Sequence, residues 1–298
     1  MNLYDAKEHL NKKGYFFLKS FFSEEKLINI SNIANSIVEK SKKNLWKHIK
    51  VYRDYYPFFN NINIFGVDYP LNKDLNDSTF EEFQKLDYKK NLLETLEWKD
   101  FNTTLVRLHT NSSFYNYQGE WHRDDSEYPS PHSIQAIIYL QDEEGYRIVP
   151  KNKNSLLKKY NISTDSQIDE DNSFVELPRD MYDIIIAKKG DILFHQSGLL
   201  HQGFCKKKRL HFHLRHIKSD TIQNSDNKDI FNFTEPYSKN FDLNNVKVNH
   251  NSFNKNLIIK TIRLKTFLLY FFPRVKSILN NLINSKNRQT IFHSTFWQ

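Results

Sequence analysis

Cysteine, glycine and proline are scarce in this chain of 298 residues, which contains one Cys, seven Gly and eight Pro. Cys205 has no second cysteine to pair with, so an internal disulfide is excluded, which suits a reducing compartment. The N-terminal segment lacks the apolar run of a secretory signal, and we expect a cytoplasmic protein. With 24 Phe, 16 Tyr and 4 Trp, the composition also excludes a disordered chain.

Acidic residues are missing from the C-terminal part of the sequence. None follows Asp242, whereas nine basic residues do. Residues 1–242 therefore hold 34 basic and 35 acidic residues, and the net charge of +8 arises in the tail alone. Whatever this charge attracts, the body of the protein need not bind it.

The basic tail also lacks a long apolar run. Lys260, Arg263 and Lys265 interrupt the apolar residues of 256–284, so this segment is not expected to span a bilayer. One interpretation is an interfacial helix, broken near Pro273, that makes peripheral contact with a membrane surface. The equal alternative is an ordinary helix packed on the body. Nucleic acid is a weaker third partner, because no recognisable binding module accompanies the charge.

Short runs rich in β-branched and aromatic residues dominate the chain from residue 101 onward. The expected strands are 103–109, 133–140, 146–149, 174–177, 183–187, 191–195 and 209–216. A helix, a short strand and a second helix are expected over 5–41, and a helical pattern recurs near 79–97. Several short strands at fairly regular spacing predict a sandwich or barrel, here mainly β with flanking helices.

The distribution of apolar, polar and charged residues along the sequence suggests three parts. Residues 1–216 are predicted to form one domain, 217–255 a polar linker or meander, and 256–298 a basic, apolar helical tail. Within the domain, residues 150–173 form a long polar insertion between strands. Insertions of this length are often functional, and we predict that this one is a lid.

The stretch "GEWHRDDSE" (119–127) places an imidazole beside a carboxylate. On a strand, His122 and Asp124 would point the same way, because positions i and i+2 share a face. A further histidine, His201, follows an apolar strand in "GDILFHQSGLLHQGF" (190–204). Two histidines and one carboxylate hold non-haem Fe(II) on one face and leave positions open for a cosubstrate and O₂. We therefore predict His122, Asp124 and His201 as catalytic metal ligands.

Such an iron centre usually needs an electron source, and 2-oxoglutarate would leave a distal carboxylate that requires a fixed cation. In "RLHFHLRH" (209–216), Arg209, His211, His213 and Arg215 share one strand face. The two arginines lie about 20 Å apart along an extended strand, so we expect that only one of them serves a small diacid. Arg209 is favoured and Arg215 is the alternative.

Other polar residues share strand faces close to the predicted site. The further candidates for binding the keto acid or the substrate are Arg107, His109, Asn111, Gln135 and Tyr139, with ordinary pairing as the equal alternative. His195 is expected to be a strand residue or a partner behind a ligand. His211 and His213 either line the pocket or pack as hydrogen-bonded histidines. Cys205 is expected in a turn without a catalytic role.

The order and spacing of several blocks resemble the phytanoyl-CoA dioxygenase-like family of Fe(II)/2-oxoglutarate-dependent oxygenases. The blocks are "HLNKKGYFFLKSFFSEEKL", "RLHTNSS", "WHRDD", "IIYLQDEEGYRIVPKNKNS" and "KKGDILFHQSGLLHQG", and the resemblance spans roughly residues 7–216. It implies a double-stranded β-helix (jelly-roll or cupin-like) core, Fe(II) on His122, Asp124 and His201, and 2-oxoglutarate held by Arg209.

The chain departs from this family at two places. The segment that usually reads Pro-Gly-Ser-His in this family is Pro-Lys-Asn-Lys at 150–153. The arginine, Arg209, follows the second histidine, His201, after only eight residues, which is closer than is common in the family. Relatives that halogenate have a small residue in place of the carboxylate, so the presence of Asp124 favours hydroxylation of a small or lipid- or glycan-linked metabolite. Two other classes stay open: a non-oxidative cupin-like isomerase, and a non-catalytic protein that binds membrane surfaces through its tail.

Overall fold

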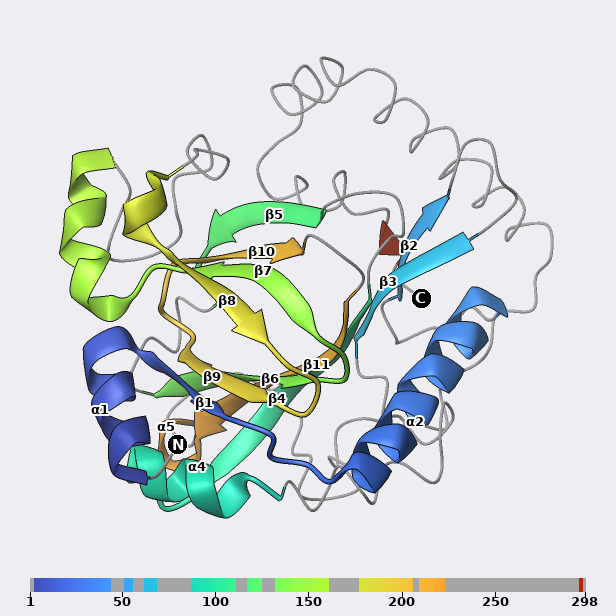
Figure 1. The fold of residues 1–298 in the computed structure, drawn as a ribbon, viewed down its shortest axis with the longest axis horizontal. Coiled ribbons are helices and arrows are strands. Elements are labelled where there is room, and N and C mark those ends of the chain that lie inside the picture. Colours follow the sequence, from blue (N-terminus) through green and yellow to red (C-terminus); the bar gives the residue numbers. More distant parts are fainter. Residues whose placement is uncertain are drawn as a thin grey trace.

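Two antiparallel β-sheets face each other and form the centre of the molecule (Figure 1). The computed structural model describes residues 3–43, 51–55, 62–68, 87–110, 117–124, 132–160, 177–205, 209–222 and 295–296. The arrangement is the mainly β, jelly-roll-like fold that the strand pattern predicts. The predicted tail at 256–284 and most of the linker lie outside the described residues.

The larger sheet has eight strands in the order β1-β9-β6-β11-β4-β3-β2-β12. Its strands are β1 (Tyr15–Leu18), β2 (Val51–Tyr55), β3 (Ile62–Asp68), β4 (Phe101–Thr110), β6 (Ser133–Tyr139), β9 (Ile192–Gln196), β11 (Leu210–Lys218) and β12 (Thr295–Phe296). Every residue of the central strand β6 is buried, because both faces of the sheet are covered. Strand β11 runs two residues beyond the expected end at 216 and is followed by the short helix α5 (Ser219–Ile222).

The smaller sheet has four strands in the order β5-β10-β7-β8. They are β5 (Tyr117–His122), β7 (Glu143–Ile148), β8 (Asp183–Ala187) and β10 (His201–Cys205). The prediction that Cys205 lies in a turn is wrong, because the residue ends β10 and pairs with Tyr117 of β5. The run after His201 has little apolar character, so its strand pairing is apparent only from the neighbouring β5.

Three helices pack against the outer face of the larger sheet: α1 (Leu3–Lys13), α2 (Glu24–Lys43) and α4 (Lys89–Leu96). Their buried aliphatic residues join the outward side chains of the strands in one apolar cluster, as Leu10 and Ile30 do with Phe194 and Phe212. A second cluster fills the space between the sheets, where Ile137 of β6 meets Ile148 of β7. Alternation along each strand therefore places one set of side chains under the helices and the other set inside the barrel.

The predicted lid begins as a packed element. Residues Lys151–Tyr160 form a 3₁₀ helix, η1, whose Leu157 is fully buried. Leu157 lies in a small apolar cluster with Trp121, Tyr182 and Leu200 on the outer side of the smaller sheet. This half of the insertion is thus part of the folded body, and residues 161–173 lie outside the described residues.

The Gly-Asp pair at 190–191 closes the turn that leads into β9. Gly190 adopts φ +89°, a left-handed conformation that favours glycine, and a Cβ there would meet Leu27 at 3.0 Å. The buried Asp191 accepts backbone hydrogen bonds from Ser20 at 2.9 Å and Lys188 at 3.0 Å. The carboxylate therefore joins the end of β1 to the turn before β9, which carries the chain toward His201.

His216 on β11 points away from the barrel interior and is a buried, fully bonded histidine. Its ring lies 2.9 Å from both the Tyr88 hydroxyl and the Thr103 hydroxyl. Burial lowers the pKa of His216 to about 3. Above pH 6.5, His216 is unprotonated in both the folded and the unfolded state. Below pH 6.5 the unfolded state binds a proton at this histidine and the folded state does not, so the folded state loses stability as the pH falls toward 3.

We expect acid to destabilise the protein partly through this histidine. Between pH 6.5 and 5, His216 should lower the free energy of unfolding by up to about 1.4 kcal/mol per pH unit. Urea unfolding at several pH values measures the slope, and His216→Asn should give a shallower slope whatever its stability at pH 7.5. Parallel curves for the two proteins would contradict this assignment.

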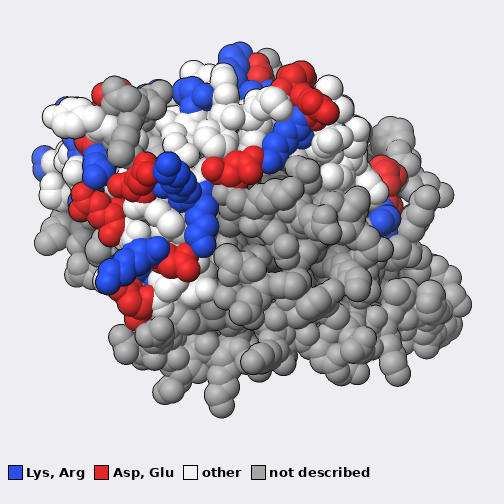
Figure 2. Space-filling view, turned by 90° about the horizontal axis from the view of Figure 1, so that it is seen from below, with Lys and Arg blue, Asp and Glu red and all other residues white. Residues whose placement is uncertain are grey.

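Basic and acidic side chains lie next to one another on the face shown in Figure 2. Examples from the described surface are the ion pairs of Lys188 with Asp142 and of Lys189 with Glu24. This mixture agrees with the near-zero net charge of residues 1–242. Among the described helices, none has the length and apolar character needed to cross a membrane.

Candidate functional site

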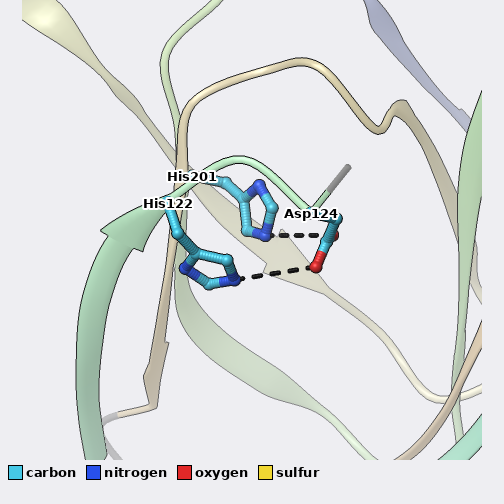
Figure 3. Close-up of side chains that lie close together, drawn as sticks. All are labelled: His122, Asp124 and His201. Carbon is cyan, nitrogen blue, oxygen red and sulfur yellow. Dashed lines mark ion pairs between the residues drawn. The ribbon is translucent and has the colours of Figure 1, made fainter. Parts of the chain in front are cut away.

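His122, Asp124 and His201 lie close together where β5 ends and β10 begins in the smaller sheet (Figure 3). Strands β5 and β10 pair so that His122 stands directly opposite His201, and Asp124 follows β5 by two residues. Asp124 Oδ1 lies 3.6 Å from His122 Nε2, and Asp124 Oδ2 lies 3.2 Å from His201 Nε2. The structure thus brings together the three residues predicted as metal ligands.

The contacts of His201 show that this group fits a metal ion. Its Nδ1 lies 3.0 Å from the carbonyl oxygen of Leu199, which can only accept, so Nδ1 carries hydrogen and Nε2 faces Asp124. Asp124 Oδ2 is buried and accepts no hydrogen bond of good geometry within the described part of the chain. A proton on Nε2 would be shared with this oxygen, and a metal cation that takes the place of that proton could be bound by both atoms. Two imidazoles and one carboxylate are suitable donors for a divalent transition metal.

Asp124 is held from two further directions. Its backbone N–H donates to the carbonyl oxygen of Ser197 at 3.2 Å. Arg215 donates to the backbone carbonyl of Asp124 at 3.2 Å and lies 3.5 Å from its Oδ1. Burial raises the pKa of Asp124, but the charges of His201 and Arg215 and the hydrogen bonds from His122 and His201 outweigh it, so the pKa lies well below its usual range. The carboxylate is therefore ionised, as a metal ligand must be.

A second group of possible ligands shares Asp124. One ring nitrogen each of His195 and His213 lies within 4.8 Å of a carboxylate oxygen of Asp124. Burial, followed by the charge of His201, lowers the pKa of His195 to about 3, and burial lowers the pKa of His213 well below its usual value. Both rings are therefore neutral at pH 7.

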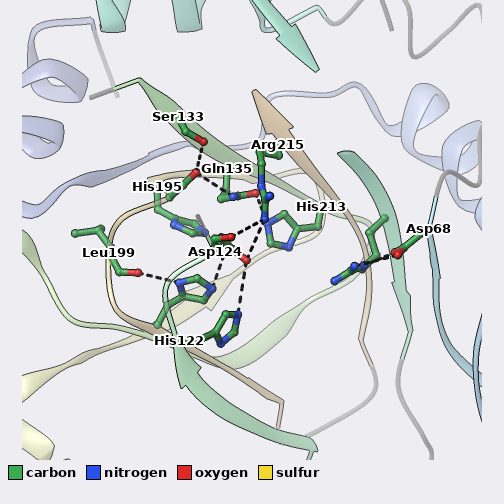
Figure 4. A network of polar contacts seen from close by, with 12 residues as sticks. Asp68, His122, Asp124, Ser133, Gln135, His195, Leu199, His213 and Arg215 are labelled. Carbon is green, nitrogen blue, oxygen red and sulfur yellow. Dashed lines mark hydrogen bonds and ion pairs between the residues drawn. The ribbon is translucent and has the colours of Figure 1, made fainter. Parts of the chain in front are cut away.

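Hydrogen bonds to protein groups distinguish this second group from the first. His213 Nε2 lies 2.8 Å from Gln135 Oε1, and the Gln135 amide continues to Ser197 and Ser133 (Figure 4). His195 Nδ1 donates to a backbone carbonyl, and its Nε2 accepts from the Tyr146 hydroxyl at 3.1 Å. These contacts favour His195 and His213 as polar residues that lie beside the metal ligands and do not bind the metal. For His195 this agrees with the expected role as a partner behind a ligand.

The two candidate arginines lie in different places. Arg215 lies at the metal end, against Asp124. Arg209 is buried just before β11, where its Nε donates to the carbonyl oxygen of Thr110 at 3.0 Å. Among the contacts given above, only Arg215 therefore touches a predicted metal ligand directly. Arg209 lies beside Thr110, at the other end of β11.

The remaining candidates line the same interior or fall outside it. Gln135 is fully buried and bonded to His213, and Tyr139 is buried with its ring against His211. Arg107 forms an ion pair with Asp68 of β3, with Nη2 and Oδ2 3.0 Å apart (Figure 4). Asn111 lies outside the described residues.

Arg123 is a site residue that the sequence did not single out. It is buried between the two predicted ligands of "WHRDD", and its Nη1 donates to the carbonyl oxygen of Gly198. Its Nη2 donates to Asn154 Oδ1 of η1 at 3.1 Å. Arg123 thus connects the segment that carries His122 and Asp124 to both the β9–β10 turn and η1. Asp124 is bonded to Ser197 of the same turn. On a strand, Arg123 would face the side opposite to His122, so the sequence pattern did not indicate this role.

We expect Arg123→Met to weaken metal binding by about 10- to 100-fold, the usual cost of losing a partner behind the ligands. Calorimetric titration with Co(II) measures the affinity, and Arg123→Lys should recover part of it. Lys151→Met, at an exposed position at the start of η1, is the control and should leave the affinity unchanged. An unaltered affinity in a folded Arg123→Met protein would remove the positioning role.

Tyr146 of β7 was also missed. Its ring centroid lies 5.5 Å from that of His201, and its hydroxyl bonds His195. Burial, followed by the charge of Asp124, raises the pKa of Tyr146 well above its usual value, while the charge of Arg209 acts in the opposite direction. Tyr146 thus lies within electrostatic range of both the metal ligands and Arg209. Tyr146 lies two residues before the buried Ile148 and shares its face of β7, and this spacing is the sequence signal that indicates an inward side chain.

Comparison with known proteins relates this chain to solved structures by its fold. No protein-family model matches the sequence, and no curated protein sequence matches it. AviO1 from Streptomyces viridochromogenes Tue57 is similar in structure, with a TM-score of 0.56 and 11% identity over 73% of this chain and 96% of that one.

Two other similar structures contain the expected small molecules. One is the epimerase SnoN in complex with Fe³⁺, α-ketoglutarate and nogalamycin RO (TM-score 0.53, 11% identity, 73% of this chain and 84% of that one). The other is EctD from S. alaskensis with 2-oxoglutarate and 5-hydroxyectoine (TM-score 0.52, 12% identity, 72% of this chain and 76% of that one). The chain therefore shares its jelly-roll fold with these proteins.

Proposed function

We propose that this protein is an Fe(II)- and 2-oxoglutarate-dependent oxygenase of the phytanoyl-CoA dioxygenase-like type. The observation that carries the proposal is the group of His122, Asp124 and His201, with one buried carboxylate oxygen of Asp124 and His201 Nε2 facing each other at 3.2 Å. The shared fold with enzymes crystallised with iron and 2-oxoglutarate supports the choice of metal and cosubstrate.

The chain's own residues divide the work in this proposal. His122, Asp124 and His201 hold the metal, while Arg215 and the Ser197 carbonyl hold Asp124 in place. Arg209 binds the distal carboxylate of 2-oxoglutarate, and the neutral His195 and His213 line the space between the metal and the larger sheet. When bound, Fe(II) with 2-oxoglutarate and O₂ supplies the oxidation of a substrate C–H bond, with succinate and CO₂ as coproducts. The buried interior restricts access of water to this chemistry.

A small or lipid- or glycan-linked metabolite is the proposed substrate, hydroxylated at carbon. SnoN is named an epimerase, which makes epimerisation at the same centre the second candidate. The mass of the product separates the two reactions, because hydroxylation adds one oxygen atom and epimerisation leaves the mass unchanged. A peripheral membrane contact through 256–284 remains a prediction for the tail.

An anaerobic titration tests the proposal. The iron-loaded protein receives increasing 2-oxoglutarate, and the metal-to-ligand charge-transfer band is followed in the visible range. A saturable band supports the keto acid bound at the metal. Absence of a band in folded, iron-loaded protein would overturn the proposed function.

A further inference from the structure

The turn between β9 and β10 contacts both chain segments that carry the predicted metal ligands. The Ser197 carbonyl oxygen accepts the backbone N–H of Asp124 at 3.2 Å. The Leu199 carbonyl oxygen lies 3.0 Å from His201 Nδ1, and this contact sets which ring nitrogen faces Asp124 (Figure 4). A hydrogen bond from the Leu199 N–H to the Gln196 carbonyl oxygen, 3.0 Å long, closes the turn. The position of this turn therefore determines where two of the three predicted ligands lie.

Gly14 lies against this turn. It connects α1 to β1, and its carbonyl oxygen accepts the backbone N–H of Gln196 at 2.9 Å. A Cβ at this position would lie 2.9 Å and 3.0 Å from the two methyl carbons of Leu199, which is closer than the van der Waals contact of about 3.5–4.0 Å. Leu199 is buried in the apolar cluster between the sheets, so its side chain has little free space to rotate away. The turn can therefore occupy its position because Gly14 has no side chain.

The residues on either side of Gly14 fix this connection to the smaller sheet. Asp183 of β8 accepts hydrogen bonds from the Tyr15 hydroxyl at 2.6 Å and from Lys13 Nζ at 3.2 Å. Tyr15 is buried, and its backbone pairs with His195 of β9. These bonds oppose any movement of the connection away from the β9–β10 turn. A side chain at position 14 would therefore displace the turn.

The backbone conformation of Gly14 has a second explanation, because the residue also ends α1. Its φ is +79°, and its N–H donates to the Leu10 carbonyl oxygen at 2.8 Å. Glycine is common at this position after a helix, and asparagine also adopts the left-handed conformation. Ending the helix requires only the backbone conformation, whereas the close approach of Leu199 also requires the absence of a Cβ. Gly14→Asn therefore separates the two roles.

We propose that Gly14 is a positioning residue of the metal site, which keeps the β9–β10 turn at the place where His201 and Asp124 share one metal ion. Gly14 acts through Leu199 and Gln196 and is not itself a ligand. The inference rests on the proposed function and goes beyond it, because it assigns the placement of two ligands to the connection between α1 and β1.

Calorimetric titration with Co(II) compares Gly14→Asn and Gly14→Ala with the wild-type protein. Both variants place a Cβ against Leu199, and each should weaken Co(II) binding about tenfold, the lower end of the usual cost of disturbing a partner behind a ligand. The visible absorption bands of bound Co(II) report its coordination geometry and should change as well. If Gly14→Ala does not fold, Gly14→Asn carries the test, because asparagine tolerates the backbone conformation.

Gly190→Ala is the matched control. Gly190 has φ +89°, and a Cβ there would meet Leu27 at 3.0 Å in the apolar cluster under the helices. The strain and the close contact thus resemble those of Gly14→Ala, but they lie away from the β9–β10 turn. In urea unfolding Gly190→Ala should lose stability as Gly14→Ala does, while its Co(II) affinity stays within about a factor of two of the wild type.

Leu199→Ala tests whether the effect passes through the proposed contact. It removes the methyl groups that the new Cβ would meet, so Gly14→Asn should weaken Co(II) binding less in the Leu199→Ala protein than in the wild type. Independent sites would give equal changes in both backgrounds. The inference is overturned if Gly14→Asn binds Co(II) as the wild type does, if the changes are equal, or if Gly190→Ala loses as much affinity. If the wild-type protein binds no Co(II), the proposed function itself fails.

Discussion

Asp124→Ala should abolish both metal binding and 2-oxoglutarate turnover. The side chain supplies the only carboxylate of the predicted metal centre, lies 3.2 Å from His201 Nε2 and is ionised because the surrounding charges lower its pKa. Loss of this ligand leaves only His122 and His201 of the predicted metal donors, beside the positive Arg215. We expect a fall in Fe(II) or Co(II) affinity greater than the roughly 100-fold that removal of an outer partner costs. Calorimetry with Co(II) measures it.

Two control variants separate this loss from general damage. Asp142→Ala removes an exposed carboxylate whose partner is Lys188, and should leave metal affinity unchanged. Asp124→Glu keeps the charge but lengthens the side chain, and should retain part of the affinity. Full metal affinity in Asp124→Ala would show that the ion, if bound, is held elsewhere, and would exclude this triad.

Arg209→Met should weaken 2-oxoglutarate binding roughly 30-fold or more, because removing one partner of a buried charge pair costs about 2–5 kcal/mol. The residue is buried just before β11 and is fixed through the carbonyl oxygen of Thr110. The charge-transfer titration gives the dissociation constant. The affinity for Co(II) should stay within a factor of about three, because Arg209 acts at the far end of the cosubstrate.

The alternative assignment of the cosubstrate arginine gives the opposite result. If Arg215 binds the distal carboxylate, then Arg209→Met keeps the affinity and Arg215→Met loses it. Under our proposal Arg215→Met changes metal binding first, since this arginine contacts Asp124. Arg179→Met, which removes an arginine that stacks on Tyr182, is the control for loss of a positive charge.

The sequence by itself determined the strands with strong alternation and the identity of the predicted ligands. "RLHFHLRH" became β11, because its period-two pattern matches the two faces of a pleated strand. "SIQAIIYL" became β6, a run rich in β-branched and aromatic residues that is buried on both faces. His122 and Asp124 could be paired from their spacing alone. In contrast, β10 was not predicted, because the stretch after His201 has no apolar pattern and is stabilised by pairing with β5 and β7.

Only the tertiary structure decided which polar residues surround the metal ligands. Arg123 reaches Gly198 and Asn154, and Glu143 reaches His211, across 31 to 75 residues of sequence. Such contacts depend on the register of strand pairs, and a shift of one residue would turn His211 to the outer face. Local spacing carries no information on that register, which is set by the packing of the two sheets around one interior.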